Sequence, residues 1–347
     1  MDTLLYRFTK PNKYIAAFDL DGTLIKTKSG NKFPKNATDY QYAFDNVQEK
    51  LNELLLQKYK IVIFTNQKGI KTKKTNKTDI INKITKLFPF ADYFISTDDD
   101  LYRKPMIGMF DKFMELNGEV NDIFYVGDAA GRKNDHSFAD INFAYNAKIK
   151  FFTETEYFTG EIDLDIAPLC PEQEGKVNKI SDMKLYDQYV VFIMQGFPAS
   201  GKTSFIKEYV KQNKIKNSLH LSNDTHTKSK LKKALKKGME DEAVIFIDNT
   251  NATKNNRKEI IDIVKNDKDY NIIGIYITTS MTMAKALNKQ RYYISNMDEN
   301  YKGKVYGKIP YVAYNVFKKR FEKMEKEEGF YKIINFLPDI KLKYCFI

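Results

Sequence analysis

Short apolar runs alternate with stretches of helical periodicity along the first half of the chain. Apolar runs of this length, bounded by turn residues, predict buried strands at 14–18, 60–64, 93–96 and 123–126. Apolar residues three or four apart predict helices at 36–60, 78–88 and 110–116. Because strands and helices alternate, we expect a parallel, doubly wound sheet of the α/β class.

An acidic, irregular stretch separates this half from a second α/β segment. Residues 161–186 contain Pro168, Pro171 and Gly175 and show no clear period, which predicts a connection between domains at 1–160 and 187–347. The second domain is expected to hold strands at 189–194, 243–248 and 272–278 and helices around 205–212 and 228–237. Its remainder is predicted to be mainly helical, most clearly at 311–326.

The composition fits a two-domain globular protein, because 42% of the 347 residues are hydrophobic. No apolar run approaches the ~20 residues that span a bilayer, and residues 1–13 lack the apolar core of a signal peptide, so no membrane partner is expected. Cys170 and Cys345 predict neither a disulfide framework nor a metal site, and the three histidines are too scattered for a metal centre. We therefore expect a reducing, intracellular location, in the nucleus or the cytoplasm.

The net charge of +12 favours a polyanionic partner such as nucleic acid. A second explanation stays open, because six of the 57 basic residues are arginine and Asn, Ile, Tyr and Phe are frequent, as an A/T-rich genome would produce. The rare arginines are more informative. Arg103, Arg132, Arg257 and Arg291 all lie within the motifs described below.

Two carboxylates follow the first predicted strand, in the stretch Asp19-Leu20-Asp21-Gly22-Thr23. At the carboxyl end of a parallel strand, such side chains point into the crevice where α/β folds bind ligands. A solvated turn is the alternative. The pattern resembles the signature of the haloacid-dehalogenase-like phosphatases, which implies that Asp19 attacks phosphorus and that Asp21 serves as acid and base.

An aspartyl-phosphate mechanism also needs positive groups around the phosphate and further carboxylates to hold Mg²⁺. Thr65 ends a predicted strand and can hold a phosphate oxygen, while Lys104 can neutralise the nucleophile and the phosphate. Asp128 can complete a Mg²⁺ site with Asp19 and Asp21, since a hard cation prefers oxygen ligands. The alternatives are a helix N-cap for Thr65, a surface lysine for Lys104 and a turn for Asp128.

The resemblance extends along the first domain. It is carried by Ser29-Gly30, Phe33-Pro34, Phe64-Thr65-Asn66-Gln67, Tyr102-Arg103-Lys104-Pro105, Gly127-Asp128-Ala129-Ala130-Gly131-Arg132 and Asp135-x-Ser137-x-Ala139-Asp140. These segments resemble the 3′-phosphatase domain of the polynucleotide kinase 3′-phosphatase family. The likeness implies that substrate is bound by Asn66, Arg103 and Arg132, together with Arg257 of the second domain.

A second site is predicted from Gly196-Phe197-Pro198-Ala199-Ser200-Gly201-Lys202-Thr203, which matches GxxxxGK[ST] directly after a strand. The backbone N–H groups of such a loop cradle the phosphates of ATP, the lysine reaches the β and γ groups, and the threonine holds Mg²⁺. A chance glycine-rich turn is the alternative. ATP and Mg²⁺ are therefore the expected cofactors.

Three residues beyond this loop complete the predicted kinase site. Asp224 can take the proton of an attacking hydroxyl, although a helix N-cap is a competing interpretation. Asp248 begins Asp248-Asn249-Thr250-Asn251, which resembles the family's segment at this place, and it can support Mg²⁺ or Lys202. Arg291 lies in a helix that resembles the family's lid, whose arginine stabilises the transferring phosphate.

The resemblance covers about residues 15–340, in the order of the animal-type enzymes: a haloacid-dehalogenase-like phosphatase domain, then a P-loop kinase domain. It implies a bifunctional enzyme that removes 3′-phosphates and phosphorylates 5′-hydroxyls, so that a ligase can act downstream. DNA is the expected substrate, with RNA open. A forkhead-associated domain, and scaffold docking through it, is not expected. Two rivals stay open: a small-molecule phosphatase fused to a metabolite kinase, and a catalytically inactive end-binding scaffold.

Overall fold

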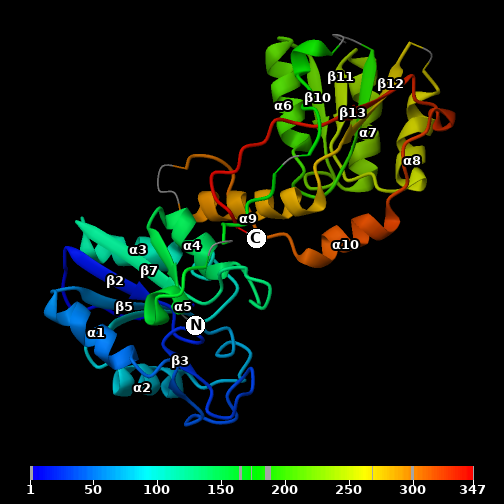
Figure 1. The fold of residues 1–347 in the computed structure, drawn as a ribbon. Helices are drawn as coiled ribbons and strands as arrows, with labels where there is room; N and C mark the ends of the chain where they lie inside the picture. Colours follow the sequence, from blue (N-terminus) through cyan, green and yellow to red (C-terminus); the bar gives the residue numbers. More distant parts are fainter. Residues whose placement is uncertain are drawn as a thin grey trace. The chain divides into compact units, whose positions relative to one another are not determined.

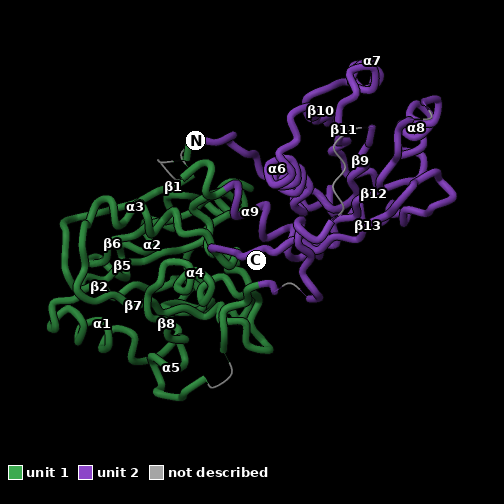
Figure 2. Tube along the Cα trace, turned by 90° about the horizontal axis from the view of Figure 1, so that it is seen from above, with its two compact units in different colours: residues 1–170, 293–302, 344–347 green, residues 171–292, 303–343 purple. Residues whose placement is uncertain are grey.

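The computed structural model describes residues 3–163, 166–172, 174–183, 189–267, 269–297 and 301–346. The chain forms two compact units, which Figure 2 colours separately. Unit 1 contains residues 1–170 with 293–302 and 344–347, and unit 2 contains residues 171–292 and 303–343. The division at 170/171 falls inside the stretch expected to connect two domains. The return of two later segments to unit 1 has no signal in the sequence.

A six-stranded sheet forms the centre of unit 1, in the order β1-β6-β5-β2-β7-β8. All neighbouring pairs are parallel except the edge strand β1, which runs antiparallel to β6. The strands are β1 Leu4–Arg7, β2 Tyr14–Phe18, β5 Lys60–Asn66, β6 Asp92–Ser96, β7 Asp122–Gly127 and β8 Lys150–Thr153, and a separate pair joins β3 Ile25–Lys26 to β4 Gln41–Tyr42. The predicted parallel sheet is confirmed, with β1 and β8 as additions at its edges.

Helices cover both faces of this sheet (Figure 1). On one face, α1 (Val47–Leu56), α2 (Lys77–Leu87) and α5 (Glu154–Thr159) share a core with Phe18 of β2. On the other face, Phe113 of α3 (Gly108–Asn117) and Phe143 of α4 (Ala139–Ala147) lie 5.9 and 5.5 Å from Phe64 between ring centroids. The central strands serve two cores, which explains why they are apolar on both faces.

The predicted helix at 36–60 is wrong over its first part, because α1 begins only at Val47. The loop before it folds around the carboxylate of Asp39, which accepts hydrogen bonds from Lys35 N (2.8 Å), Ser29 Oγ (2.7 Å) and Ser29 N (2.8 Å). These bonds, chiefly that from Lys35 N, lower the pKa of Asp39 to about 2. A side chain that collects backbone donors in this way competes with helix formation.

Unit 2 is built on a five-stranded, all-parallel sheet in the order β10-β11-β9-β12-β13. Its strands are β9 Val190–Gln195, β10 Ser218–Leu221, β11 Val244–Ile247, β12 Asn271–Ile277 and β13 Lys332–Phe336. α6 (Lys202–Gln212) covers one face, and α7 (Lys228–Glu240) and α8 (Lys254–Val264) cover the other (Figure 1). The strand β13 corrects the prediction of a mainly helical remainder.

Two further α-helices follow β12. They are α9 (Met281–Met297), whose last residues belong to unit 1, and α10 (Tyr311–Arg320), and short 3₁₀ turns lie at Ile180–Asp182 and Lys326–Glu328. The helix expected at 311–326 ends at Arg320, because the carbonyl of Glu322 turns to accept Gln195 Nε2 (2.9 Å) and Arg257 Nη1 (3.0 Å). Within the described parts of the chain, none of the helices combines the length and apolarity required to cross a bilayer.

A disulfide joins Cys170 to Cys345, which corrects the expectation that the two cysteines form no such bond. Both belong to unit 1, and their Cα atoms lie 4.9 Å apart although 175 residues separate them in the sequence. The pairing arises because residues 344–347 return to unit 1, and no spacing rule reveals such a return.

Candidate active sites

The first site lies where β2, β5 and β7 end. Asp19 follows β2, Thr65 lies near the end of β5, and Asp128 follows β7. Since β2 pairs in parallel with both other strands, their carboxyl ends meet at one edge of the sheet. Asp19 is 7% exposed and Thr65 is 1% exposed. This is the edge at which α/β sheets bind ligands.

The ammonium group of Lys104 joins this edge from the loop between β6 and α3. Its Nζ donates to Asp19 Oδ1 (2.6 Å), Tyr125 OH (2.7 Å) and Asp140 Oδ1 (2.7 Å). Burial favours the neutral amine, but Asp140 and Asp19 outweigh it and raise the pKa of Lys104 above its ordinary value. Lys104 therefore stays charged beside the predicted nucleophile.

Asp140, in the first turn of α4, is a site residue to which the sequence assigns no role. Its Oδ1 accepts hydrogen bonds from Lys104 and from Tyr125 OH (2.8 Å), and its Oδ2 accepts one from Ala129 N (3.0 Å). Its carboxylate also lies in a cluster with Asp19 and Asp128, whose ligand oxygens are all within 4.8 Å of one another. The sequence signal that could have revealed Asp140 is its position at the end of segment 135–140, which resembles the family.

Burial, together with the neighbouring negative charges, raises the pKa values of Asp19 and Asp128. Burial outweighs the effect of Lys104 and raises the pKa of Asp19 to about 7. Burial, followed by the charges of Asp140 and Asp19, raises the pKa of Asp128 to about 9. A divalent cation would favour the charged form of each carboxylate, and oxygen ligands suit Mg²⁺. The donor set therefore fits Mg²⁺ held by Asp19 and Asp128, since Asp140 already uses both of its oxygens.

Asp21 is exposed, and its side chain lies outside this cluster, so its role as a metal ligand stays a prediction. Gln67 Nε2 donates to Asp21 Oδ2 (2.6 Å) and to Thr65 Oγ1 (2.9 Å), a link that the sequence does not reveal. Gly22 follows with φ +94°, and a Cβ there would lie 2.3 Å from Asp128 Oδ2. The turn between Asp21 and the cluster therefore requires glycine.

Asn66 and Arg103 flank Lys104 in different ways. Asn66 Oδ1 accepts Lys104 N (2.9 Å), and Asn66 Nδ2 donates to Lys104 O (3.2 Å), so Asn66 fixes the backbone of the lysine. Arg103 Nη1 is buried and has no hydrogen-bond partner among the described residues. That donor keeps Arg103 a candidate for binding an anionic substrate.

Arg132 is engaged within the protein. Its guanidinium forms ion pairs with Asp135 (3.0 Å), Glu154 (2.9 Å) and Asp163 (3.1 Å) and donates to the carbonyl of Asp128 (2.9 Å). Three neighbouring carboxylates offset much of its positive charge. The side chain is 22% exposed, so its substrate-binding role stays a prediction, and the contacts shown here fix the loop after Asp128.

The second site, residues 196–203, is built on the loop between β9 and α6 and on the first two residues of α6. Gly196 (φ +152°) and Gly201 (φ +101°) have left-handed backbones, and a Cβ on Gly196 would lie 2.8 Å from Ser200 Oγ. Lys202 is 8% exposed, and its Nζ donates to Gly196 O (3.1 Å) and Phe197 O (2.7 Å). Burial lowers the pKa of Lys202 to about 8. The N-terminus of α6 adds free backbone N–H groups, so the loop suits phosphate.

Asp248 lies beside this loop at the end of β11. Its Oδ2 accepts a hydrogen bond from Thr203 Oγ1 (2.5 Å) and contacts His220 Nε2 (2.9 Å). Burial would raise the pKa of Asp248, but the hydrogen bonds from His220 and Thr203 lower it below its ordinary value. An ionised carboxylate beside the threonine hydroxyl fits Mg²⁺. His220 has no signal in the sequence, because its strand β10 is too short to be predicted.

Asp224 lies in an exposed turn after β10, and its interpretation as a helix cap is wrong. α7 begins at Lys228 and is capped by Thr227, whose side chain accepts Lys230 N (3.4 Å). The charge of Asp224 acts on both Lys202 and Arg291, which places these three groups near one another.

Arg291, on α9, presents an unused donor. Its guanidinium lies 4.8 Å from the ring centroid of Tyr306, and its Nε is buried without a hydrogen-bond partner in the part of the chain that is described. Burial lowers its pKa. A buried cation with a free N–H is what a transferring phosphate would satisfy.

Arg257 is fully buried, which corrects its predicted role in substrate binding. Nε and Nη2 each lie 2.8 Å from an oxygen of Glu328, and Nη1 donates to the carbonyls of Asn251 and Glu322 (3.0 Å each). A guanidinium that is 0% exposed cannot reach a nucleic-acid strand. It instead ties the segment after β11 to residues 322–328.

Known proteins resemble this chain over most of its length. Residues 14–158 match the family model described as polynucleotide kinase 3 phosphatase. The chain is 34% identical over 345 residues to the bifunctional polynucleotide phosphatase/kinase of Schizosaccharomyces pombe, covering 94% of this chain and 80% of that protein. It is 39% identical over 167 residues to a polynucleotide 3′-phosphatase of Arabidopsis thaliana, covering 42% of this chain and 24% of that protein.

Binding of Mg²⁺ to unit 1 should release protons. The pKa values of about 7 for Asp19 and about 9 for Asp128 leave these carboxylates partly protonated near neutral pH, and a bound cation displaces the protons. The affinity for Mg²⁺ should therefore rise from about pH 6 to about pH 9. Calorimetric titration of the full chain in buffers of different ionisation enthalpy measures both effects. Asp128→Asn should remove the part of the proton release that comes from Asp128, and the exposed substitution Glu119→Gln should retain the full release. A pH-independent affinity would contradict this account.

Arg257→Lys should destabilise unit 2. Lysine cannot form the two-point pair with Glu328, and breaking a buried ion pair costs about 3–5 kcal/mol. Thermal unfolding should show a lower Tm for this variant and a normal one for Lys258→Ala at the exposed neighbouring position. A normal Tm together with a raised KM for nucleic acid would restore the substrate-binding role.

Proposed function

The chain belongs to the family of bifunctional polynucleotide phosphatase/kinases, and we propose that it heals nucleic-acid ends in two steps. Unit 1 hydrolyses a 3′-phosphate, and unit 2 transfers the γ-phosphate of ATP to a 5′-hydroxyl. The observation that carries the proposal is the presence of two chemically different phosphate sites in one chain. Each lies at the carboxyl end of a strand in the middle of a parallel sheet, β2 in unit 1 and β9 in unit 2.

In unit 1, Asp19 attacks phosphorus and forms an aspartyl phosphate. Lys104 donates to Oδ1 of Asp19, and its charge counters the charge that builds on the phosphate. Asp21 gives a proton to the leaving 3′-oxygen and then takes one from the water that hydrolyses the intermediate. Mg²⁺, held by Asp19 and Asp128, would neutralise further negative charge.

In unit 2, Asp224 takes the proton of the attacking 5′-hydroxyl. Lys202 exchanges its loop carbonyls for the phosphates of ATP, whose negative charge returns the pKa of this lysine toward its ordinary value. Arg291 gives its free Nε–H to the transferring group. Thr203 and Asp248 are the residues that would hold Mg²⁺.

Nucleic acid suits the surroundings of Asp224. A cavity of about 120 Å³ between α7 and α8 adjoins this turn, and its lining includes Asn223, Lys228 and Lys232. Lysines one turn apart on a helix can follow the phosphates of a strand. We propose DNA ends as the preferred substrate, with RNA ends as the second candidate. A ligase would then seal the healed ends, inside the cell.

The two activities should be separable. Asp19→Ala removes the nucleophile and should abolish 3′-phosphatase activity while kinase activity persists, and Lys202→Ala should do the reverse. The assay is a nicked duplex with a 3′-phosphate and a 5′-hydroxyl, incubated with Mg²⁺ and ATP, with both ends resolved by electrophoresis. If either folded variant loses both activities, the proposal of two independent sites fails.

Asp224→Asn should lower kinase turnover about 10²–10⁴-fold, the usual contribution of a general base. The substitution keeps the size of the side chain and removes the proton acceptor. Since Thr227 caps α7, stability should not change. Single-turnover rates with saturating ATP measure the effect, and Asp241→Asn, at an exposed position after α7, is the matched control. A near-normal rate for Asp224→Asn would exclude this residue as the base.

A further inference from the structure

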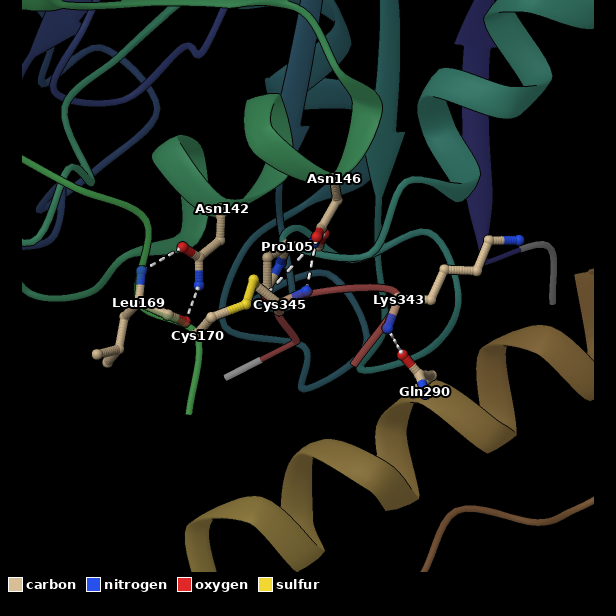
Figure 3. The surroundings of a disulfide bond; sticks show 8 residues. All are labelled: Pro105, Asn142, Asn146, Leu169, Cys170, Gln290, Lys343 and Cys345. Atoms are coloured by element: carbon tan, nitrogen blue, oxygen red, sulfur yellow. Dashed lines mark hydrogen bonds between the residues drawn. A yellow bond between two sulfur atoms is a disulfide. The ribbon is translucent and has the colours of Figure 1, made fainter. Parts of the chain in front are cut away.

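Two buried asparagines of α4 hold the two segments that the disulfide joins (Figure 3). Asn142 Oδ1 accepts Leu169 N (2.8 Å), and its Nδ2 donates to Leu169 O (3.1 Å). One turn later, Asn146 Oδ1 accepts Cys345 N (2.7 Å), and its Nδ2 donates to Cys345 O (3.3 Å). Cys170 directly follows Leu169. The disulfide therefore links two segments of the chain, and hydrogen bonds fix each of them to α4.

Asn146 also contacts the loop that carries Lys104. Its Nδ2 donates to Pro105 O at 3.0 Å (Figure 3). Near the start of α4, Asp140 binds Lys104 Nζ at 2.7 Å. α4 thus holds residues 104–105 at two points, the ammonium group and the following carbonyl. A displacement of the Asn146 amide would be transmitted to a lysine that lies 2.6 Å from Asp19.

The C-terminal segment is seated within unit 1. Cys345 is 1% exposed and Phe346 is 0% exposed. Tyr344 and Phe346 pack against Tyr293, with ring centroids 5.3 and 5.1 Å away. Tyr293 OH in turn donates to Asp111 of α3. Cys170, by contrast, is partly exposed.

We propose that Asn146 is a positioning residue of the 3′-phosphatase site and that the Cys170–Cys345 disulfide latches it, so that phosphatase turnover depends on redox state. In the oxidised protein, the Asn146 amide is held between Cys345 and Pro105. In the reduced protein, the segment 344–346 keeps only noncovalent contacts, and its release removes two of the three hydrogen bonds that orient this amide. The inference rests on the phosphatase activity proposed above.

The latch opens by thiol–disulfide exchange with a dithiol reductant. A thiolate of the dithiol attacks Sγ of the partly exposed Cys170, the bond to Cys345 Sγ breaks, and Cys345 leaves as a thiolate that takes up a proton. The second thiol of the reductant then attacks the mixed disulfide and releases Cys170. Two electrons and two protons pass to the protein, and the dithiol becomes a disulfide. Oxidation reverses these steps.

The test compares the two redox forms of the full chain. Protein oxidised with oxidised glutathione is desalted, and half of it is reduced with dithiothreitol. Alkylation followed by intact-mass measurement should count no free thiols in the first form and two in the second, one for each cysteine. On a 3′-phosphorylated oligonucleotide, the reduced form should show a kcat lower by about tenfold and an unchanged KM, because the loss concerns the orientation of Lys104.

Three variants identify the route. Cys170→Ser with Cys345→Ser should have the kcat of the reduced protein and no response to dithiothreitol. Asn146→Ala should have a low kcat and a normal KM in both redox states. Asn142→Ala, which releases Leu169 but not Pro105, is the matched control and should keep the redox difference.

Equal kcat values for the verified oxidised and reduced forms would overturn the latch, as would a failure of oxidised glutathione to form the disulfide. A redox difference that persists in Asn146→Ala would overturn the role of Asn146. If Asn146→Ala also loses kinase activity through misfolding, the wild-type comparison decides alone. Absence of phosphatase activity in both wild-type forms would instead overturn the proposed function.

Discussion

A buried ammonium shared between carboxylates is the interaction on which unit 1 depends. Lys104 is 4% exposed, and burial alone would favour its neutral form. Asp19 and Asp140 keep it charged, and Tyr125 satisfies its third donor position. Burial, and after it the charges of neighbouring carboxylates, raises the pKa values of Asp19 and Asp128. A further cation bound beside them would favour their charged forms.

The buried lysine of unit 2, Lys202, has different partners and the opposite pKa shift from Lys104. Lys202 is also buried, but its hydrogen-bond partners are the carbonyls of Gly196 and Phe197, so burial lowers its pKa to about 8. Asp248 lies near Lys202, but its carboxylate forms its hydrogen bonds with Thr203 and His220. Lys104 donates hydrogen bonds to carboxylates of the protein itself. Lys202 donates to neutral carbonyls and gains an anionic hydrogen-bond partner only when phosphate binds. The first arrangement suits a covalent nucleophile that is part of the protein. The second suits a nucleotide that binds and dissociates in each cycle.

Residues at strand ends could be predicted from the sequence because parallel strands bring their carboxyl ends together. Asp19, Thr65, Asp128 and the loop 196–203 follow this rule. Lys104 and Asp224 lie in loops, outside this rule, and were predicted from the charge and the proton acceptor that each reaction needs. The sequence does not reveal the roles of Asp140, Gln67 and His220, because those roles depend on partners from other elements. The contacts of two rare arginines could not be predicted for the same reason: Arg257 binds Glu328, 71 residues away, and Arg132 binds Asp163, 31 residues away. The disulfide, which closes 175 residues, had no local signal at all.

Asparagine side chains fix several segments of unit 1 to distant parts of the chain. Four asparagine side chains each accept from the N–H and donate to the C=O of one distant residue, as a neighbouring strand would: Asn66 on Lys104, Asn117 on Asn12, Asn142 on Leu169 and Asn146 on Cys345. A neutral amide satisfies both backbone groups without the desolvation cost of a buried charge. An aspartate could accept from the N–H but could not donate to the carbonyl. A composition that looks like nucleotide bias therefore also supplies the side chain that fixes loops on which the phosphatase site depends.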